Sequence, residues 1–363
     1  MSREKTACFH AVVAGASGVV GRRLATHLAA LPDWEVTGLS RRAPANVAFK
    51  TLAVDLTNAA DCQAKLGTLT DTTHIFYAAR YDHKTTAPEP IDLNTNMLRH
   101  LVDAVQPRAA NLQHIHMVQG SKYYGSNLPS YKTPALESDP RVANNANFYY
   151  AQEDFLVARQ QSGGQRWSWS ASRPHAICDF SIGFARALGL LIAVYASICK
   201  ARGEPLSFPG TVGNYNALYQ CTEAKLLARA IQWISTEPTC ANQAFNITNG
   251  DFIRWKNLWP LFADYFGLPL GGVNTQRLGD TTTTPQAAQT WAQIVEKSHL
   301  KTNSYVTYDM LVVWPYGDFV FGPAIDIMSS TIKARQLGFR DAMDTGRMFI
   351  DLFDYYRREK VIP

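Results

Sequence analysis

Residues 11–24 read AVVAGASGVVGRRL, and this stretch decides the fold class of the chain. Its apolar start predicts a strand, and Gly15, Gly18 and Gly21 follow that strand directly. A helical pattern begins before the last of these glycines. This order is typical of the first βαβ unit of a dinucleotide-binding domain. Gly15 permits the tight turn, Gly18 lets the backbone approach a pyrophosphate, and Gly21 lets the helix pack closely on the sheet. The helix N-terminus then faces the anion. A glycine-rich turn without a ligand is the alternative, and the strand–turn–helix context argues against it.

The composition indicates a folded, mildly basic protein. The 363 residues are 46% hydrophobic and 18% charged, with a net charge of +5 and no dense basic stripe, which argues against nucleic-acid binding. The six cysteines show no metal-ligand spacing, so we expect free thiols in a reducing compartment and no metal site. The N-terminus lacks an apolar signal core, and the longest apolar stretch, 187–198, is shorter than the ~20 residues that span a bilayer. We therefore expect a cytoplasmic protein without a membrane segment.

Short apolar runs alternate with helical patterns through the first half of the chain, which predicts a parallel sheet. The expected strands are 10–14, 34–39, 47–54, 74–77, 112–118 and 167–172, and the expected helices are 20–30, 91–105 and 147–161. After residue 174 a long helix is expected at 184–202, then a Gly/Pro-rich segment at 203–213, a helix at 223–235 and a strand at 244–247. The remainder is expected to be mostly helical, with a Thr-rich loop at 280–285. The prediction is an α/β protein of the Rossmann type, with a doubly wound parallel sheet and a smaller, mainly helical C-terminal substrate lobe. The cofactor domain is expected to span 1–180, with a return segment at about 215–250, and the lobe 181–363.

The end of the second expected strand indicates which nicotinamide cofactor the chain prefers. NAD-specific proteins place an acidic residue about 20 positions beyond the glycines, where it accepts the ribose hydroxyls. Here Ser40, Arg41 and Arg42 hold that position. Two guanidinium groups suit a 2′-phosphate, so NADPH/NADP+ is favoured over NADH. The alternative is a solvated arginine loop.

The other expected cofactor contacts follow the strand ends in order. Asp55 and Leu56 follow the third strand, near the adenine, and the small Ala78 and Ala79 follow the fourth, where space is needed for ribose and phosphate. The full set of expected cofactor-binding residues is Gly15, Ser17, Gly18, Val19, Val20, Gly21, Ser40, Arg41, Arg42, Asp55, Leu56, Ala78, Ala79, Gln119, Tyr149, Pro174, Ala176 and Ile177.

The catalytic helix of short-chain dehydrogenases carries a Tyr-x-x-x-Lys pair on one face, where the ammonium lowers the pKa of the phenol. In this chain the spacing occurs only at Tyr356 and Lys360, close to the C-terminus, where we expect a chance match on a surface helix. The expected helix instead begins NFYYAQED at 147–154, with Glu153 four residues after Tyr149. A carboxylate there would weaken the phenol as a hydrogen-bond donor, so either the site is inactive or a cation comes from elsewhere.

Lys122 is a candidate for that cation. It follows the fifth expected strand within QGSKYYG at 119–125, and strand ends at this edge face the cofactor crevice. A surface lysine is the alternative.

The combination of these motifs resembles the progesterone 5β-reductase/iridoid synthase (PRISE) family, the atypical extended short-chain dehydrogenases. The similarity extends along the chain through GASGVVG, THIFYAA, GSKYYG, NFYYAQED, SRPHAI, NQAFNITNGDFIRWK and the C-terminal LGFRD and KVIP. The resemblance implies hydride transfer from NADPH to the β-carbon of an α,β-unsaturated ketone or aldehyde, an enone or enal. It places Tyr149 and Lys122 at the family's catalytic positions, where they would stabilise the enolate as an oxyanion hole does.

The chain departs from the family pattern near the expected substrate. Ala79-Arg80-Tyr81 replaces a Thr-Trp type sequence, and RPHAICD at 173–179 replaces RPGNIFG. Arg80 suggests a polar substrate if it points inward and an ordinary solvated charge if it points outward. The candidate substrate contacts are Arg80, Tyr81, Tyr124 and His175, and His175 has a structural loop residue as its alternative.

The competing functions are an NADPH-dependent carbonyl reductase or sugar-type epimerase of the extended short-chain class, and a non-catalytic NADPH sensor. The missing Tyr-x-x-x-Lys helix argues against the first, and the joint presence of Tyr149 and Lys122 argues against the second. We expect a small-molecule substrate and neither nucleic acid nor membrane as partner. The sequence leaves a homodimer open.

Overall fold

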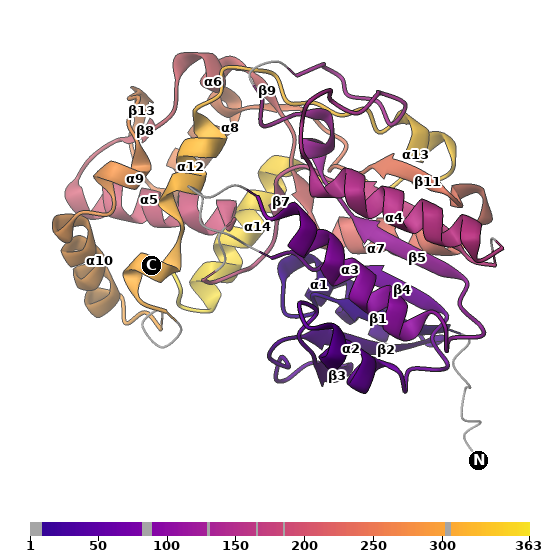
Figure 1. Ribbon diagram of the computed structural model, residues 1–363. Coiled ribbons are helices and arrows are strands. Elements are labelled where there is room, and N and C mark those ends of the chain that lie inside the picture. The colour runs from indigo at the N-terminus through magenta and orange to yellow at the C-terminus, as the bar shows by residue number, and fades with distance from the viewer. Residues whose placement is uncertain (1–8, 82–88, 129–130, 165, 184–185, 302–305) are drawn as a thin grey trace.

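Seven parallel strands form the central sheet of the computed structural model, which describes residues 9–81, 89–128, 131–164, 166–183, 186–301 and 306–363 (Figure 1). The strand order is β11-β6-β5-β4-β1-β2-β3. The strands are β1 (Phe9–Ala14), β2 (Trp34–Ser40), β3 (Lys50–Ala53), β4 (His74–Tyr77), β5 (His114–Val118), β6 (Ser168–Arg173) and β11 (Gln243–Asn246). The central strands are buried on both faces, and for this reason β4 reads HIFY without polar alternation. The Rossmann-type parallel sheet predicted from the sequence is confirmed.

The direction of chain winding reverses between β1 and β4. From β1 the chain adds β2 and β3 on one side, then returns to add β4, β5 and β6 on the other. In open α/β sheets, ligands bind in the crevice beyond the carboxyl ends of the strands at such a reversal. The glycine turn after β1 and Ala78 after β4 flank this point, and the Ala78 amide donates to the Ala14 carbonyl oxygen at 3.1 Å.

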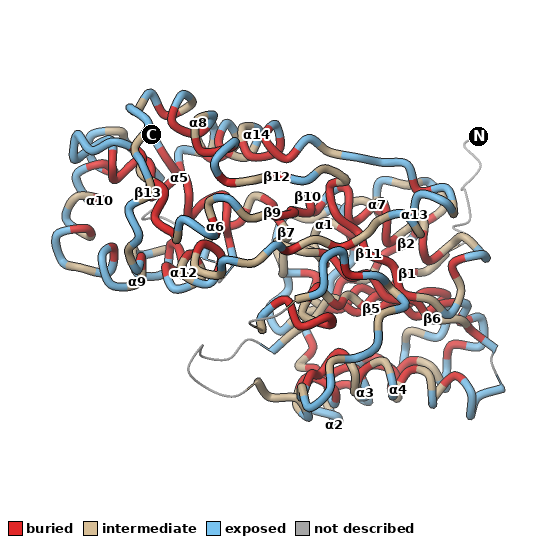
Figure 2. The backbone as a smooth tube through the Cα atoms, turned by 90° about the horizontal axis from the view of Figure 1, so that it is seen from above, coloured by how far each residue is buried: buried red, intermediate tan, exposed pale blue. Residues whose placement is uncertain are grey.

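Helices cover both faces of the sheet (Figures 1 and 2). One hydrophobic cluster lies under α2 (Ala59–Leu66), α3 (Ile91–Val105) and α4 (Phe148–Ser162). A second lies under α1 (Val19–Ala29) and α7 (Ala224–Thr236) on the opposite face. Helix α2 is not predicted from the sequence, because its eight residues bury only Cys62 and Leu66 and so show little periodicity.

A third hydrophobic cluster is built almost wholly from the second half of the chain, beside the strand ends (Figure 1). Its main helices are α5 (Leu188–Arg202), α8 (Trp255–Phe266), α10 (Pro285–Lys297), α12 (Trp314–Phe321) and α14 (Thr345–Arg358). Shorter elements complete this part and its connections: η1 (Ser121–Tyr124), β7 (Ile177–Cys178), β8 (Leu206–Phe208), α6 (Val212–Asn216), β9 (Leu218–Tyr219), β10 (Thr222–Glu223), η2 (Pro238–Cys240), β12 (Ile253–Arg254), β13 (Leu270–Val273), α9 (Leu278–Thr281), α11 (Tyr308–Leu311) and α13 (Ile332–Gln336). Four tryptophans of this cluster are fully buried, as core packing predicts: Trp255, Trp259, Trp291 and Trp314. In the described part of the chain, no helix is both long and apolar enough to cross a membrane.

Several sequence-based boundaries differ from the structure. The Gly/Pro-rich segment 203–213 contains β8, because Leu206 and Phe208 are buried and the strand pairs with β13. The expected helix at 184–202 is described only from Leu188, and residues 184–185 lie outside the described residues. The Thr-rich stretch 280–285 holds the end of α9 and the start of α10, whose first turn is capped by the Thr284 hydroxyl. The expectation of a surface position for Tyr356 was wrong, because its hydroxyl is buried against the backbone of 179–181.

A ladder of histidines and serines crosses the sheet beneath α1 and α7. His114 lies between the hydroxyls of Ser168 and Ser170 at 2.7 and 2.6 Å, and His116 lies between those of Ser170 and Ser172 at 2.7 and 3.0 Å. Burial lowers the pKa of His116 to about 3 and holds the pKa of His114 well below its usual range. Both rings are therefore neutral in the folded protein at neutral pH.

We expect this ladder to make folding stability sensitive to mild acid. The unfolded state binds protons on these rings near pH 6.5 and the folded state does not, so stability is lost as the pH falls from about 6.5 toward 4. Each such histidine contributes a slope of about 1.4 kcal/mol per pH unit in that window. Urea unfolding of His116→Gln between pH 7 and 4.5 should show a shallower slope than the parent. His299→Asn, at an exposed histidine outside the ladder, is the matched control variant. Equal slopes for His116→Gln and the parent would refute the assignment.

Candidate active site

The glycine turn after β1 forms a cradle of the shape that a pyrophosphate requires. Gly15 has a φ of +83°, and a Cβ atom built there would lie 2.7 Å from the Ala78 carbonyl oxygen. A Cβ atom on Gly21 would lie 2.3 Å from the Gly15 carbonyl oxygen, so the first turn of α1 packs directly on the turn backbone. Gly18 is the N-cap of α1 and provides no side-chain cap. The amides of the first helical turn therefore point at the space where an anion would lie, and the cradle fits a dinucleotide.

The arginines expected at the 2′-phosphate lie on an exposed loop directly after β2. Arg41 and Arg42 are solvent-exposed, and the Ser40 hydroxyl donates to the Arg42 carbonyl oxygen at 2.7 Å. Both guanidinium groups are thus placed at the strand end with their charges accessible. At the next strand end, the Asp55 carboxylate accepts from the amide and hydroxyl of Thr57 at 3.0 and 2.8 Å, and Leu56 is buried. Asp55 therefore shapes this turn.

Tyr149 stands in the first turn of α4, with its ring buried. The Asn147 side chain accepts from the Tyr149 amide at 3.0 Å and donates to the Lys122 carbonyl oxygen at 3.1 Å, so one cap joins the helix to the turn after β5. A Cβ atom on Gly120 would lie 3.3 Å from the Tyr149 hydroxyl and 3.4 Å from the Pro174 carbonyl oxygen. The phenol therefore lies over Gly120, just beyond the end of β5, and near Pro174, just beyond the end of β6. A residue larger than glycine at 120 would crowd it.

Lys122 and Arg80 converge on the carboxylate of Glu89. The Lys122 ammonium forms an ion pair with one Glu89 oxygen, and the Arg80 guanidinium donates to the other at 3.1 Å. Both cations lie over the Phe148 ring, 5.9 Å from its centroid for Lys122 Nζ and 5.6 Å for Arg80 Cζ. Phe148 packs edge-on against Tyr149, with ring centroids 4.5 Å apart. The structure thus places the Lys122 ammonium over the ring of Phe148, which packs against Tyr149, and it turns Arg80 toward the same cluster.

Glu153 lies four residues after Tyr149, where a carboxylate is expected to weaken the phenol as a hydrogen-bond donor. The structure surrounds this carboxylate with donors: Arg173 at 3.0 Å, Arg141 at 3.1 Å, the Tyr123 hydroxyl at 3.0 Å and the Gln119 amide at 3.1 Å. Two guanidinium groups compensate its charge. The Glu153 charge is therefore balanced within the protein, which removes the reason to expect an inactive site.

Two expected contact residues use their polar groups inside the same network. The Gln119 side chain accepts from Arg173 at 2.8 Å, and the Tyr124 hydroxyl accepts from Arg173 at 3.0 Å and donates to Asn246 at 2.7 Å. Both residues are buried. Gln119 as a cofactor contact and Tyr124 as a substrate contact therefore remain predictions, in competition with an evident structural role.

His175 forms a polar pair on the other side of Gly120. Its Nδ1 lies 2.6 Å from the Ser121 hydroxyl, its Nε2 is buried, and its ring packs edge-on against Tyr219. Burial lowers the pKa of His175 to about 4. These contacts favour the structural interpretation of His175. Among the other expected residues, Ala176 and Ile177 lead into β7 beside this pair, and Tyr81 is half-exposed with its amide bonded to Asn94 at 2.8 Å.

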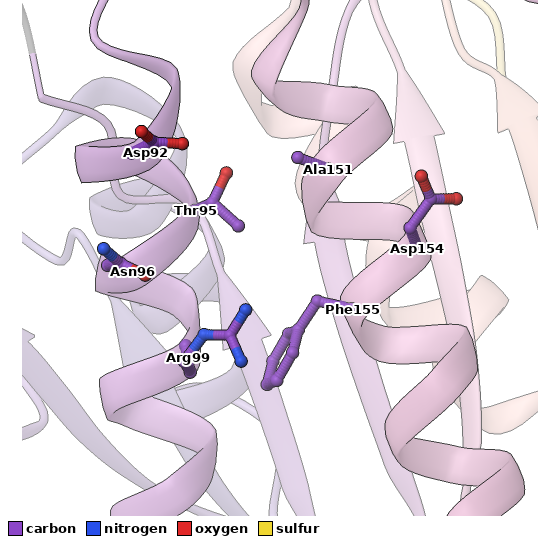
Figure 3. Close-up of a pocket in the computed structure, with 7 residues that line it drawn as sticks. All are labelled: Asp92, Thr95, Asn96, Arg99, Ala151, Asp154 and Phe155. Atoms are coloured by element: carbon purple, nitrogen blue, oxygen red, sulfur yellow. The ribbon is translucent and has the colours of Figure 1, made fainter.

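A groove between α3 and α4, with a volume of about 490 Å³, lies on the outer face of these helices (Figure 3). Figure 3 shows Thr95 and Arg99 of α3 facing Ala151 and Phe155 of α4, and Arg99 lies over the Phe155 ring at 4.8 Å. None of its lining residues is an expected site residue. The lining residues are Asp92, Thr95, Asn96, Arg99, Ala151, Asp154 and Phe155.

Three residues of this site are not predicted from the sequence: Glu89, Asn147 as a helix cap, and Arg173. Asn147 precedes the aromatic start of α4, where an Asn N-cap is a recognisable pattern. Glu89 and Arg173 have no such pattern, because their partners lie 33 and 20 residues away in the chain.

Comparison with known proteins agrees with this geometry. The model of the PRISE-like Rossmann-fold domain matches residues 54–363. The chain belongs to the PRISE-like Rossmann-fold family. The resemblance predicted from the sequence motifs is therefore confirmed, and the protein is an oxidoreductase.

Named relatives of this PRISE protein are similar along nearly the whole chain. An (S)-8-oxocitronellyl enol synthase of Nepeta racemosa is 33% identical over 350 residues, which cover 92% of this chain and 87% of the relative. A 3-oxo-Δ4,5-steroid 5β-reductase of Arabidopsis thaliana is 30% identical over 368 residues, with 97% and 93% covered. Among solved structures, the UDP-glucose 4-epimerase of Thermus thermophilus in complex with NAD has a TM-score of 0.64 at 14% identity, with 96% of this chain and 99% of that chain covered. This last likeness concerns the fold, and the fold implies a nicotinamide cofactor.

Proposed function

We propose that this PRISE protein reduces the C=C bond of α,β-unsaturated ketones or aldehydes with NADPH. The observation that supports this most directly is the position of the Tyr149 phenol over Gly120, at the carboxyl end of β5, with Lys122 in the next turn of the same segment. The relatives named as an enol synthase and a steroid 5β-reductase support the same class of substrate.

The nicotinamide, when bound, supplies a hydride to the β-carbon of the substrate. Negative charge then develops on the carbonyl oxygen, and Tyr149 donates a hydrogen bond to that oxygen. Lys122 adds positive charge beside the phenol, which favours the enolate over the neutral carbonyl. Protonation of the α-carbon by solvent then yields a saturated carbonyl compound. The carbonyl group survives, because the oxygen is stabilised as an enolate and receives no hydride at its own carbon.

The product distinguishes this proposal from its alternatives. Purified protein is incubated with NADPH and a panel of linear and cyclic enones and enals, and the products are identified by mass spectrometry. A saturated ketone or aldehyde supports the proposal. An allylic alcohol would indicate a carbonyl reductase, and NADPH binding without turnover across the panel would indicate a sensor.

The preference for NADPH rests on Arg41 and Arg42, with no carboxylate at the end of β2. We expect Arg41→Ala/Arg42→Ala to raise the KM for NADPH about 100-fold, since each charge-assisted hydrogen bond contributes ~1.5–3 kcal/mol. The KM for NADH should stay within about twofold, because NADH has no 2′-phosphate. The exposed Arg340→Ala controls for a general loss of positive charge. Equal losses with both cofactors would refute the assignment.

A further inference from the structure

We infer that Glu89 is a positioning residue for Lys122. Its carboxylate is the partner that fixes the lysine ammonium over the ring of Phe148, which packs edge-on against Tyr149. The inference rests on the proposed function, because it gives Glu89 an effect on turnover only through Lys122.

Glu89 is held largely away from solvent. Its side chain is only 11% exposed, and α3 begins two residues later at Ile91. A carboxylate that is removed from water needs compensation by opposite charge and hydrogen bonds. Here Lys122 and Arg80 supply both, one to each carboxylate oxygen. The contacts of Glu89 with Lys122 and Arg80 are therefore partly buried ion pairs and not a solvent-exposed surface pair.

Lys122 needs a partner to hold its ammonium in one position, because a lysine side chain is flexible. A lysine side chain has ~2 kcal/mol of rotamer entropy and a compact charge that is not held by its own geometry. Lys122 remains 27% exposed, so without a partner its ammonium would sample several positions in water. Glu89 selects the position over the Phe148 ring, and the Asn147 side chain holds the Lys122 backbone from the other side.

The negative charge of Glu89 is divided between two cations. The carboxylate is shared between Lys122 and the Arg80 guanidinium, so Lys122 is only partly neutralised by it. The lysine can therefore stay in place and still contribute positive charge next to the phenol as the enolate forms. Arg80, in turn, holds the Glu89 carboxylate in the position from which its second oxygen reaches Lys122.

A double-mutant cycle tests this inference. Glu89→Ala should lower kcat about 10-fold, because misplacing a group by about 1 Å can cost up to ~10²-fold in rate. Glu89→Gln, which keeps the size and one acceptor, should fall between Glu89→Ala and the parent. Because Glu89 acts through Lys122, the same Glu89→Ala change in a Lys122→Met background should alter kcat less than about twofold. The KM for NADPH should not change in either background.

The controls separate positioning from folding and from the proposed function. Asp139 forms an ion pair with Lys132 in a segment away from Glu89, so Asp139→Asn should leave kcat unchanged. An equal loss on Glu89→Ala in both backgrounds, or no loss in the parent, would overturn the inference. If Lys122→Met and Tyr149→Phe keep full conjugate reduction, the proposed catalytic pair fails. If they lose it while Glu89→Ala does not, only the role of Glu89 fails.

Discussion

Tyr149→Phe should lower kcat for enone reduction by about 10²–10³-fold, the effect of removing one oxyanion-hole donor. The substitution removes only the hydroxyl that lies over Gly120 and keeps the ring that packs against Phe148. The fold and the glycine cradle are therefore expected to survive, and the dissociation constant for NADPH, measured by fluorescence titration, should change little.

Tyr150→Phe is the matched control for this prediction, because the neighbouring hydroxyl has a structural role. It donates to the Tyr123 carbonyl oxygen at 2.6 Å and accepts from the Val142 amide at 3.1 Å. Its loss should reduce stability by about 1–3 kcal/mol while kcat stays near that of the parent. The reverse outcome, with turnover lost in Tyr150→Phe and kept in Tyr149→Phe, would assign the catalytic position to the second tyrosine.

Arg173→Met should lower the free energy of unfolding by about 3–5 kcal/mol, the range for breaking a buried ion pair from one side. The Arg173 side chain is only 3% exposed and bonds to Gln119, Tyr124 and Glu153, and its guanidinium lies 3.3 Å from the centroid of the Tyr123 ring. Methionine fills part of the volume but leaves the Glu153 and Gln119 groups without this partner. Urea unfolding at pH 7 measures the difference.

Arg141→Met tests whether burial is the cause. Arg141 also bonds to Glu153, at 3.1 Å, but its side chain is 36% exposed, so its removal should cost about 0–1 kcal/mol. Arg173→Met/Glu153→Gln should recover part of the loss, since the second change removes the unpaired charge. A loss below about 1 kcal/mol for Arg173→Met would contradict this account of the network.

The division near residue 180 and the cytoplasmic location stay predictions, and the homodimer stays open. The expected cofactor residues have stronger support than these predictions, because their positions along the chain already place them at one edge of the sheet. Gly15, Ala78 and Gln119 each follow a parallel strand, and carboxyl ends of parallel strands meet at the same edge.

The sequence by itself determined the parallel sheet and the glycine cradle, because these depend on patterns within about 30 consecutive residues. It also determined the family, because several short motifs occur in the family's order along the chain. Strand β1, the glycines and α1 form one such unit, and hydrophobic periodicity specifies it without distant partners. The sequence also located Tyr149 and Lys122, each at the end or start of an expected element.

Only the tertiary structure decided how the charges around these two residues are balanced. Whether Glu153 opposes the phenol depends on Arg173, which approaches from the end of β6, and whether Lys122 is fixed depends on Glu89, which precedes α3. An isolated charge in a sequence has no defined partner, because side-chain ion pairs form between segments that only the packed fold brings within a few ångströms. The same reason made the direction of Arg80 undecidable from the sequence, and the fold turns it toward Glu89.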